Sequence, residues 1–128
     1  MMNPGIKKRI LAIEEDPTLL KILQSSSLQE QAEFLLAVDP DEGISKAAEE
    51  KPDLIILDAV TREKSGPEML QAIRSNPAAK SIPVLVFAST DDTKVKEEMT
   101  KLGVADYIVK GTVHLREVVQ RIMGAMEH

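Results

Sequence analysis

Residues 54–58, Leu54-Ile55-Ile56-Leu57-Asp58, carry the clearest indication of the fold. Four aliphatic residues stand in a row, and Pro52-Asp53 marks an abrupt start before them. A short, unbroken apolar run of this kind is typical of a strand buried on both faces, as in a parallel sheet covered by helices. The run ends in a carboxylate, and ligands of open α/β sheets collect at the carboxyl ends of the strands. We therefore expect Asp58 to lie at a functional edge.

The composition places the chain among globular proteins of one domain, residues 1–128, with 43% hydrophobic and 29% charged residues. The net charge of −5 and the absence of a dense basic patch argue against direct binding of nucleic acid. No cysteine is present, which excludes a disulfide framework and a thiolate zinc site. No apolar run approaches the length of a membrane span, and no signal peptide is evident, so we expect no membrane association and a soluble, cytoplasmic domain.

Four further apolar runs alternate with helical patterns along the chain. The expected strands are residues 10–13, 33–38, 54–58, 84–88 and 107–110. The expected helices are residues 17–27, with Asp16 as N-cap, then 41–51, 66–76, 91–102 and 115–126. Five strands alternating with five helices predict an α/β fold with a doubly wound parallel sheet. A strand order of 2-1-3-4-5 places the first and third strands side by side.

Polar residues follow three of these strands at the same edge of the sheet. Glu14 and Glu15 follow the first strand, Asp58 ends the third, and Lys110 ends the fifth. Carboxylates this close repel one another unless a cation lies among them, and their hard oxygen ligands suit Mg²⁺. A carboxylate beside a metal ion and a lysine is suited to act as a nucleophile on a phosphoryl group. Each residue alone has an ordinary explanation as a solvated turn acid or surface lysine, and the shared placement favours a site.

Four segments together resemble the receiver domain of two-component response regulators. They are ILAIEEDP at residues 10–17, PDLIILD at 52–58, IPV at 82–84 and DYIVK at 106–110. The resemblance implies a flavodoxin-like (CheY-like) fold in which Asp58 accepts a phosphoryl group from a sensor histidine kinase or a phosphotransfer protein. It further implies a signalling domain rather than an enzyme, with at most self-phosphorylation and autodephosphorylation activity.

The resemblance also implies a role for each residue at the edge. Glu15, Asp58 and the carbonyl of Val60 would bind Mg²⁺ directly, and Glu14 would bind it through water. Lys110 would pair with the phosphoryl group.

The resemblance implies that the output of the domain passes to its partner through the face formed by the fourth helix, fifth strand and fifth helix. The rotamer of Tyr107 would report phosphorylation on that face to a downstream protein or effector domain. The same face is the candidate surface for a homodimer, and the sequence leaves the oligomeric state open.

The chain departs from the receiver pattern at several positions. The acid pair, usually rich in Asp, is Glu14-Glu15. Ala88 stands where receivers carry Ser or Thr, and Ser89 is the next residue that offers a hydroxyl. Arg62 and Gly111 replace two prolines, and Gly111 removes the ordinary reason for a cis peptide after Lys110. These departures keep open a second interpretation, a pseudo-receiver that acts as a phosphorylation-independent interaction module.

Two other classes of protein conflict with the residues present. A phosphohydrolase of the haloacid-dehalogenase type needs a second Asp two residues after Asp58, and Val60 is there. A flavodoxin-type FMN site needs a loop rich in Gly, Ser and Thr after the first strand, where main-chain N–H groups meet the phosphate. Residues 14–16, Glu-Glu-Asp, would repel that phosphate.

Overall fold

The five predicted strands form one parallel sheet in the order β2-β1-β3-β4-β5, as predicted. The computed structural model describes residues 7–14, 18–24, 26–59, 64–89 and 91–127, and the account below is confined to them. The elements are β1 (Lys8–Ile13), α1 (Thr18–Gln24), the 3₁₀ helix η1 (Ser27–Glu30), β2 (Ala32–Ala37), α2 (Pro40–Glu50), β3 (Leu54–Asp58), α3 (Gly66–Ser75), β4 (Val84–Ala88), α4 (Thr93–Lys101), β5 (Asp106–Val109) and α5 (Leu115–Ala125). This architecture is the flavodoxin-like fold, with five α-helices.

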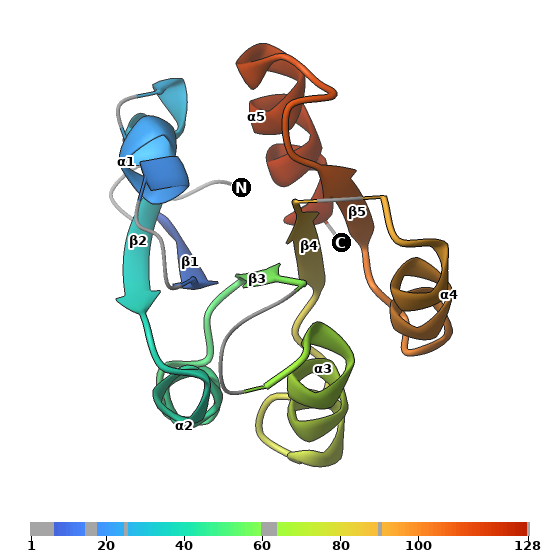
Figure 1. The fold of residues 1–128 in the computed structure, drawn as a ribbon. Helices are drawn as coiled ribbons and strands as arrows, with labels where there is room; N and C mark the ends of the chain where they lie inside the picture. The colour runs from blue at the N-terminus through green and yellow to red at the C-terminus, as the bar shows by residue number, and fades with distance from the viewer. Residues whose placement is uncertain (1–6, 15–17, 25, 60–63, 90, 128) are drawn as a thin grey trace.

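Helices cover both faces of the sheet: α1 and α5 lie on one face, and α2, α3 and α4 on the other (Figure 1). The side chains of β3 alternate between them, with Leu54 and Ile56 packed towards α1 and α5. Ile55 and Leu57 pack towards the other three helices. Full burial of an aliphatic side chain stabilises the fold by about 1.5–3 kcal/mol. The apolar run at residues 54–57 is therefore the centre of both halves of the core.

Side chains that accept hydrogen bonds from main-chain N–H groups mark the starts of three helices. Asp39, Ser65 and Asp92 are the N-caps of α2, α3 and α4. Each cap satisfies donors that a helix leaves unpaired at its first turn, which stabilises the helix by about 1 kcal/mol. Gly103, with a φ of +81°, follows α4 in the left-handed region, as expected of a glycine that ends a helix.

The predicted helix over residues 17–27 extends too far at its C-terminal end. Helix α1 ends at Gln24, and the separate helix η1 follows. The hydroxyl of Ser26 donates to the carbonyl of Leu23 and accepts from the N–H of Leu28. Such local side-chain bonds compete with the helical ladder, so the chain turns here and places Leu28 in the core.

Three strands differ from the prediction at their ends. Strand β1 is residues 8–13 rather than 10–13, and two other strands are shifted by one residue. Strand β2 is residues 32–37 rather than 33–38, and β5 is residues 106–109 rather than 107–110. Lys110 lies in the turn after β5, although its N–H still donates to the carbonyl of Ala88 at 2.7 Å. Asp16, the expected N-cap of the first helix, lies outside the described residues.

Two glycines allow main-chain segments to approach closely. A Cβ atom at Gly43 would lie 2.7 Å from the side chain of Ile13, so α2 packs directly on β1. A Cβ atom at Gly66 would lie 2.6 Å from the carbonyl oxygen of Ala59. The first residue of α3 is thus fitted against the chain that follows Asp58, which fixes the position of that strand end.

Candidate functional site

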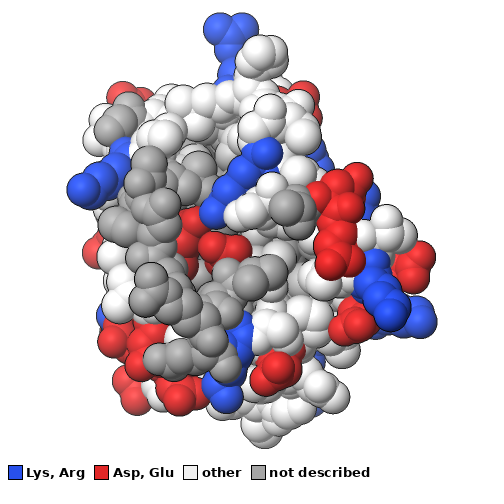
Figure 2. All heavy atoms as spheres, viewed as in Figure 1, with Lys and Arg blue, Asp and Glu red and all other residues white. Residues whose placement is uncertain are grey.

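The ends of β1, β3 and β5 bring Glu14, Asp58 and Lys110 together. Strands β1 and β3 are neighbours, and the residue before Glu14 pairs with the residue before Asp58. The N–H of Glu14 donates to the carbonyl of Ala37 at 3.0 Å, so the main chain at Glu14 continues the sheet. Figure 2 shows acidic atoms in a hollow near the middle of this view, with basic atoms above them. The carboxyl edge of the sheet therefore brings together Glu14, Asp58 and Lys110, three members of the group expected from the sequence.

Lys110 bridges the two carboxylates. Its Nζ atom lies 2.8 Å from Oε1 of Glu14 and 3.6 Å from Oδ2 of Asp58. The first contact is a charge-assisted hydrogen bond, and the second is within ion-pair range but too long for one. The side chains of Glu14, Asp58 and Lys110 are 4%, 13% and 30% exposed. Glu14 is therefore the nearer and more deeply buried partner of Lys110, and Asp58 is the more exposed of the two carboxylates.

Burial alone would lower the pKa of Lys110, but the hydrogen bond and charge of Glu14 outweigh it. Asp58 acts in the same direction, so the pKa of Lys110 is raised above its ordinary value. The ammonium group is consequently charged at every physiological pH, and it is a permanent cation beside Asp58.

The expected metal ligands lie only partly within the described residues. Glu14 and Asp58 stand at the edge, while Glu15, Val60 and the replaced loop position Arg62 lie outside the described part of the chain. Within that part, no group of three or more His, Asp and Glu residues is arranged to hold a metal. The carboxylate oxygens of Glu14 and Asp58 match the donor type that Mg²⁺ prefers, so the donor set fits the ion in kind.

Two of the departures from the receiver pattern have clear structural positions. Ala88 is 2% exposed and belongs to the core between β4 and α2–α4, so it presents a methyl group and no donor. Ser89, the next residue, is exposed. Gly111 has a φ of +84°, a value that the proline of other receivers cannot adopt.

Tyr107 is half-buried against α4, and its hydroxyl is fully enclosed. That hydroxyl has no hydrogen-bond partner among the described residues. The ammonium group of Lys96 lies 5.7 Å from the ring centroid. Burial, followed by the charges of Asp92 and Asp91, raises the pKa of Tyr107. The tyrosine is therefore neutral, and its enclosed hydroxyl is left unsatisfied by the residues that the structure describes.

Sequence reasoning missed an ion pair on the face formed by α4, β5 and α5. Arg121 of α5 donates to both carboxylate oxygens of Asp106, at 2.7 Å from Nε to Oδ2, and it also pairs with Glu117. The hydrogen bonds from Arg121 lower the pKa of Asp106. The spacing of four residues between Glu117 and Arg121 is a recognisable helical pair, but nothing in the sequence pairs Arg121 with a residue of β5.

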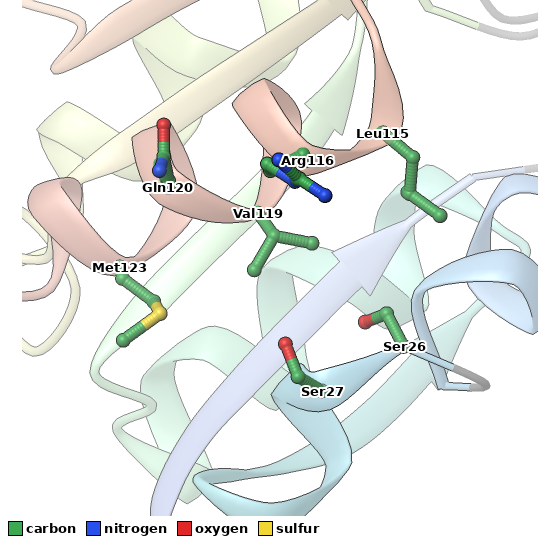
Figure 3. Close-up of a pocket in the computed structure, with 7 residues that line it drawn as sticks. All are labelled: Ser26, Ser27, Leu115, Arg116, Val119, Gln120 and Met123. Carbon is green, nitrogen blue, oxygen red and sulfur yellow. The ribbon is translucent and has the colours of Figure 1, made fainter.

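A pocket of about 440 Å³ lies away from this edge, between α5 and the start of η1. Figure 3 shows Leu115, Val119 and Met123 of α5 on one side and Ser26 and Ser27 on the other. Among the described residues that line it, Arg116 is the one that carries a charge, and none belongs to the carboxyl edge. We therefore assign the functional site to the edge.

The fold and site define a doubly wound α/β domain with two carboxylates and a lysine at its carboxyl edge. The family profile described as "Response regulator receiver domain" matches residues 10–123. The chain belongs to this family of two-component signalling proteins, whose members are in general signalling domains rather than enzymes.

Similar proteins agree with this assignment. The alkaline phosphatase synthesis transcriptional regulatory protein PhoP of Bacillus subtilis is 29% identical over 121 residues, which are 94% of this chain and 49% of that protein. The response regulator ArlR of Staphylococcus aureus is 30% identical over 118 residues, 92% of this chain and 52% of the relative. The chain thus spans about half the length of these two curated relatives.

Solved structures share the fold. A putative response regulator from Chloroflexus aurantiacus has a TM-score of 0.85 at 21% identity, covering 96% of this chain and 100% of that one. The BeF3-activated receiver domain of Klebsiella pneumoniae RstA has a TM-score of 0.82 at 21% identity, covering 94% of this chain and 100% of that one.

In the described part of the chain, no helix is both long enough and apolar enough to cross a membrane.

Proposed function

We propose that Asp58 accepts a phosphoryl group from a phosphohistidine of a sensor histidine kinase or phosphotransfer protein. The observation that carries this proposal is the position of Lys110, whose Nζ lies 3.6 Å from Asp58 and 2.8 Å from Glu14. In the transfer, a carboxylate oxygen of Asp58 forms a bond to phosphorus while the bond from phosphorus to the histidine nitrogen breaks. The electron pair of that bond stays on the imidazole, which takes up a proton.

Lys110 supplies fixed positive charge where negative charge develops on the phosphoryl oxygens. Its hydrogen bond to the buried Glu14 keeps the ammonium group protonated and oriented before the phosphoryl group arrives. Electrostatic groups placed in advance cost no reorganisation during the reaction, and loss of one such donor typically slows a reaction by about 10²–10³-fold. Glu14 therefore acts through Lys110, as a positioning residue.

Mg²⁺ fits the same edge. We propose that Glu15, Asp58 and the carbonyl of Val60 hold the ion directly and that Glu14 reaches it through water. When bound, the ion would neutralise charge on the phosphoryl oxygens. The side chains of the glutamate pair are one methylene longer than aspartates, which demands some adjustment because Mg²⁺ requires near-ideal distances of about 2.0–2.1 Å.

The second candidate function is that of a pseudo-receiver, a protein-interaction module that does not depend on phosphorylation. The buried methyl group of Ala88 favours it, because no hydroxyl at that position can donate to a phosphoryl oxygen. Ser89 is the candidate that would supply this hydroxyl. The two functions differ in whether phosphorylation changes the affinity of the chain for its partners.

Intact mass measurement with a small-molecule phosphodonor and Mg²⁺ tests the proposal. We expect the mass to rise by one phosphoryl group in the wild-type chain and in Asp91→Asn, an exposed control, but not in Asp58→Asn. Absence of labelling in the wild type would reject phosphorylation of Asp58. Labelling without any change in partner affinity would favour the pseudo-receiver instead.

The output is proposed to pass through protein contacts of the face formed by α4, β5 and α5, to a downstream protein or effector domain. A homodimer through this face is part of the proposal, and so is a cytoplasmic location. PhoP is named as a transcriptional regulatory protein, but the chain spans only 49% of it. Sedimentation of the chain with and without a beryllium fluoride mimic of the phosphoryl group tests whether the dimer forms and whether it depends on Asp58.

A further inference from the structure

Strand β2 is an outer strand of the sheet, and Figure 1 shows it on the side opposite β5. On its inner side it pairs with β1, and the carbonyls of Gln31 and Ala37 accept hydrogen bonds from N–H groups at the two ends of that strand. The main-chain groups of successive strand residues point to alternate sides. Ala32, Phe34 and Leu36 therefore direct their N–H and carbonyl groups away from β1, where the described part of the chain has no further strand.

The outward carbonyl of Leu36 has a partner in α2. Nζ of Lys46 donates to it at 2.9 Å, and the same ammonium group lies 3.3 Å from Oε1 of Glu42. A carbonyl oxygen has two lone pairs, so this one can still accept from a second donor. Within the described ranges, no element outside the sheet donates to or accepts from the outward groups of Ala32 and Phe34. The outer side of β2 is therefore open to another strand over most of its length.

Most side chains of β2 are apolar, and several are only half-buried. Phe34 and Leu36 pack towards α1 and α5, and Leu35 packs towards α2 on the other face. Val38, directly after the strand, is 50% exposed. Glu33 is exposed on the same face as Leu35, and no residue that the structure describes forms an ion pair with it. Exposed apolar side chains beside unpaired main-chain groups are characteristic of a surface that another strand covers.

We propose that two copies of this chain pair through β2 in antiparallel orientation, so that their sheets join into one. A two-fold axis at Phe34 lets each outward residue of one copy meet an outward residue of the other, because such an interface uses the same surface twice. Phe34 then lies opposite Phe34 of the partner subunit, and Ala32 lies opposite Leu36 of the partner subunit. Two aromatic rings meet at the axis, a pairing that stabilises sheets, and a small side chain faces a large one on either side of it.

The charge on β2 favours this register. A shift that brings Glu33 opposite its own copy would set two carboxylates side by side, which destabilises a sheet. With the axis at Phe34, Glu33 lies opposite Leu35 of the partner subunit, on the face that α2 covers. There Lys46 of the partner subunit holds the next carbonyl along the strand, so Glu33 comes within reach of a cation. The symmetry forms this ion pair twice.

A six-residue strand makes a small interface, below the size of most stable dimers, so we expect rapid exchange between monomer and dimer. The dimer uses neither Asp58 nor Lys110 and does not rest on phosphoryl transfer. It also lies on the opposite side of the sheet from the face formed by α4, β5 and α5. The two assemblies are therefore separable by substitutions at one surface or the other.

Sedimentation equilibrium of the unphosphorylated full chain, over a wide range of concentrations, tests the dimer. We expect Glu33→Lys to weaken association by about tenfold, because two exposed ion pairs become two like-charge contacts. Combining Glu33→Lys with Lys46→Glu restores opposite charges and should recover most of the affinity. Glu98→Lys makes the same charge change on α4, away from β2, and is the matched control. A chain that stays monomeric, or equal weakening by Glu33→Lys and Glu98→Lys, would overturn the proposal.

Amide hydrogen exchange of the wild-type chain, resolved by residue, reports the pairing itself. The N–H groups of Ala32 and Phe34 should exchange about fivefold more slowly at high protein concentration, because the dimer gives them acceptors. The N–H of Leu35 faces β1 and should not change. A dimer that leaves Phe34 unprotected uses another surface and contradicts the pairing. Protection by a synthetic peptide of residues 31–38, in a chain that does not self-associate, would assign the strand to a different extended partner and reject the dimer.

Discussion

Replacing Tyr107 with phenylalanine is expected to stabilise this protein, the opposite of the usual result for a tyrosine whose hydroxyl is bonded. The hydroxyl is enclosed and has no hydrogen-bond partner among the described residues. In the unfolded chain it is hydrated, and on folding no described residue replaces its bonds to water. A buried polar group without a partner costs about 1–3 kcal/mol. Phenylalanine keeps the ring, and with it the contact to Lys96, but removes this cost.

We expect Tyr107→Phe to raise the free energy of unfolding by about 1 kcal/mol, the lower end of the range, because the residue is only half-buried. For a chain of this size the melting temperature should rise by about 3–5 °C. Urea unfolding followed by circular dichroism gives the change, with an unchanged slope if both states keep their compactness. The reciprocal control, Phe87→Tyr, adds a hydroxyl at a position 2% exposed and should destabilise. A loss of about 1 kcal/mol in Tyr107→Phe would show that the hydroxyl is bonded in solution, and would refute the reasoning.

Three further predictions follow from main-chain geometry and charge. Gly66→Ala should lower the free energy of unfolding in urea by about 2–3 kcal/mol, because the new Cβ atom would lie 2.6 Å from the carbonyl oxygen of Ala59, just after β3. Gly124→Ala is the control and should leave the free energy of unfolding unchanged, because a Cβ atom there has no neighbour within 4 Å. Lys51→Gly should stabilise by about 0.5–1 kcal/mol by the same measurement, because Lys51 has a φ of +47° and glycine adopts that conformation without strain; equal stability would contradict this. The hydrogen bonds from Arg121 lower the pKa of Asp106 below its ordinary value of 3.8. The ion pair between Asp106 and Arg121 therefore stabilises the fold fully above pH 3.8, and this stabilisation is lost as the pH falls through the pKa of Asp106 in the folded state. The stability difference between wild type and Asp106→Asn, from urea unfolding at several pH values, should therefore shrink below about pH 4, and a constant difference would argue against the ion pair.

The sheet was predictable because its strands are buried on both faces. In β3 and β4 nearly every residue is apolar, and such runs cannot be accommodated except between two layers of helices. The same regularity made the edge predictable. Where a buried strand ends in Asp58, or is followed by Glu14, the polar side chain emerges at the carboxyl end.

The contacts around α4 and α5 were not predictable in the same way. Arg74 donates to the main-chain carbonyls of Leu102 and Gly103, and carbonyls have no signature in a sequence. Ser26 divides the first helical segment through two bonds that periodicity does not register. The choice of Glu14 as the closer partner of Lys110 depends on side-chain length and burial at a strand end, which spacing alone leaves undetermined.

In the described part of the chain, β2 and β5 are the outer strands of the sheet, and an unpaired outer strand is a template for another chain to extend the sheet. Two features of β5 disfavour such extension of the sheet. The strand has only four residues, and it carries the charged side chain of Asp106, which forms an ion pair with Arg121. Nη2 of Arg121 also donates to the carbonyl of Tyr107 at 3.3 Å, so that acceptor is already occupied. In the homodimer proposed for the face formed by α4, β5 and α5, a second copy would therefore meet side chains rather than unpaired main-chain groups. Such a dimer would dissociate without breaking a shared sheet, as the proposed reversible signal requires.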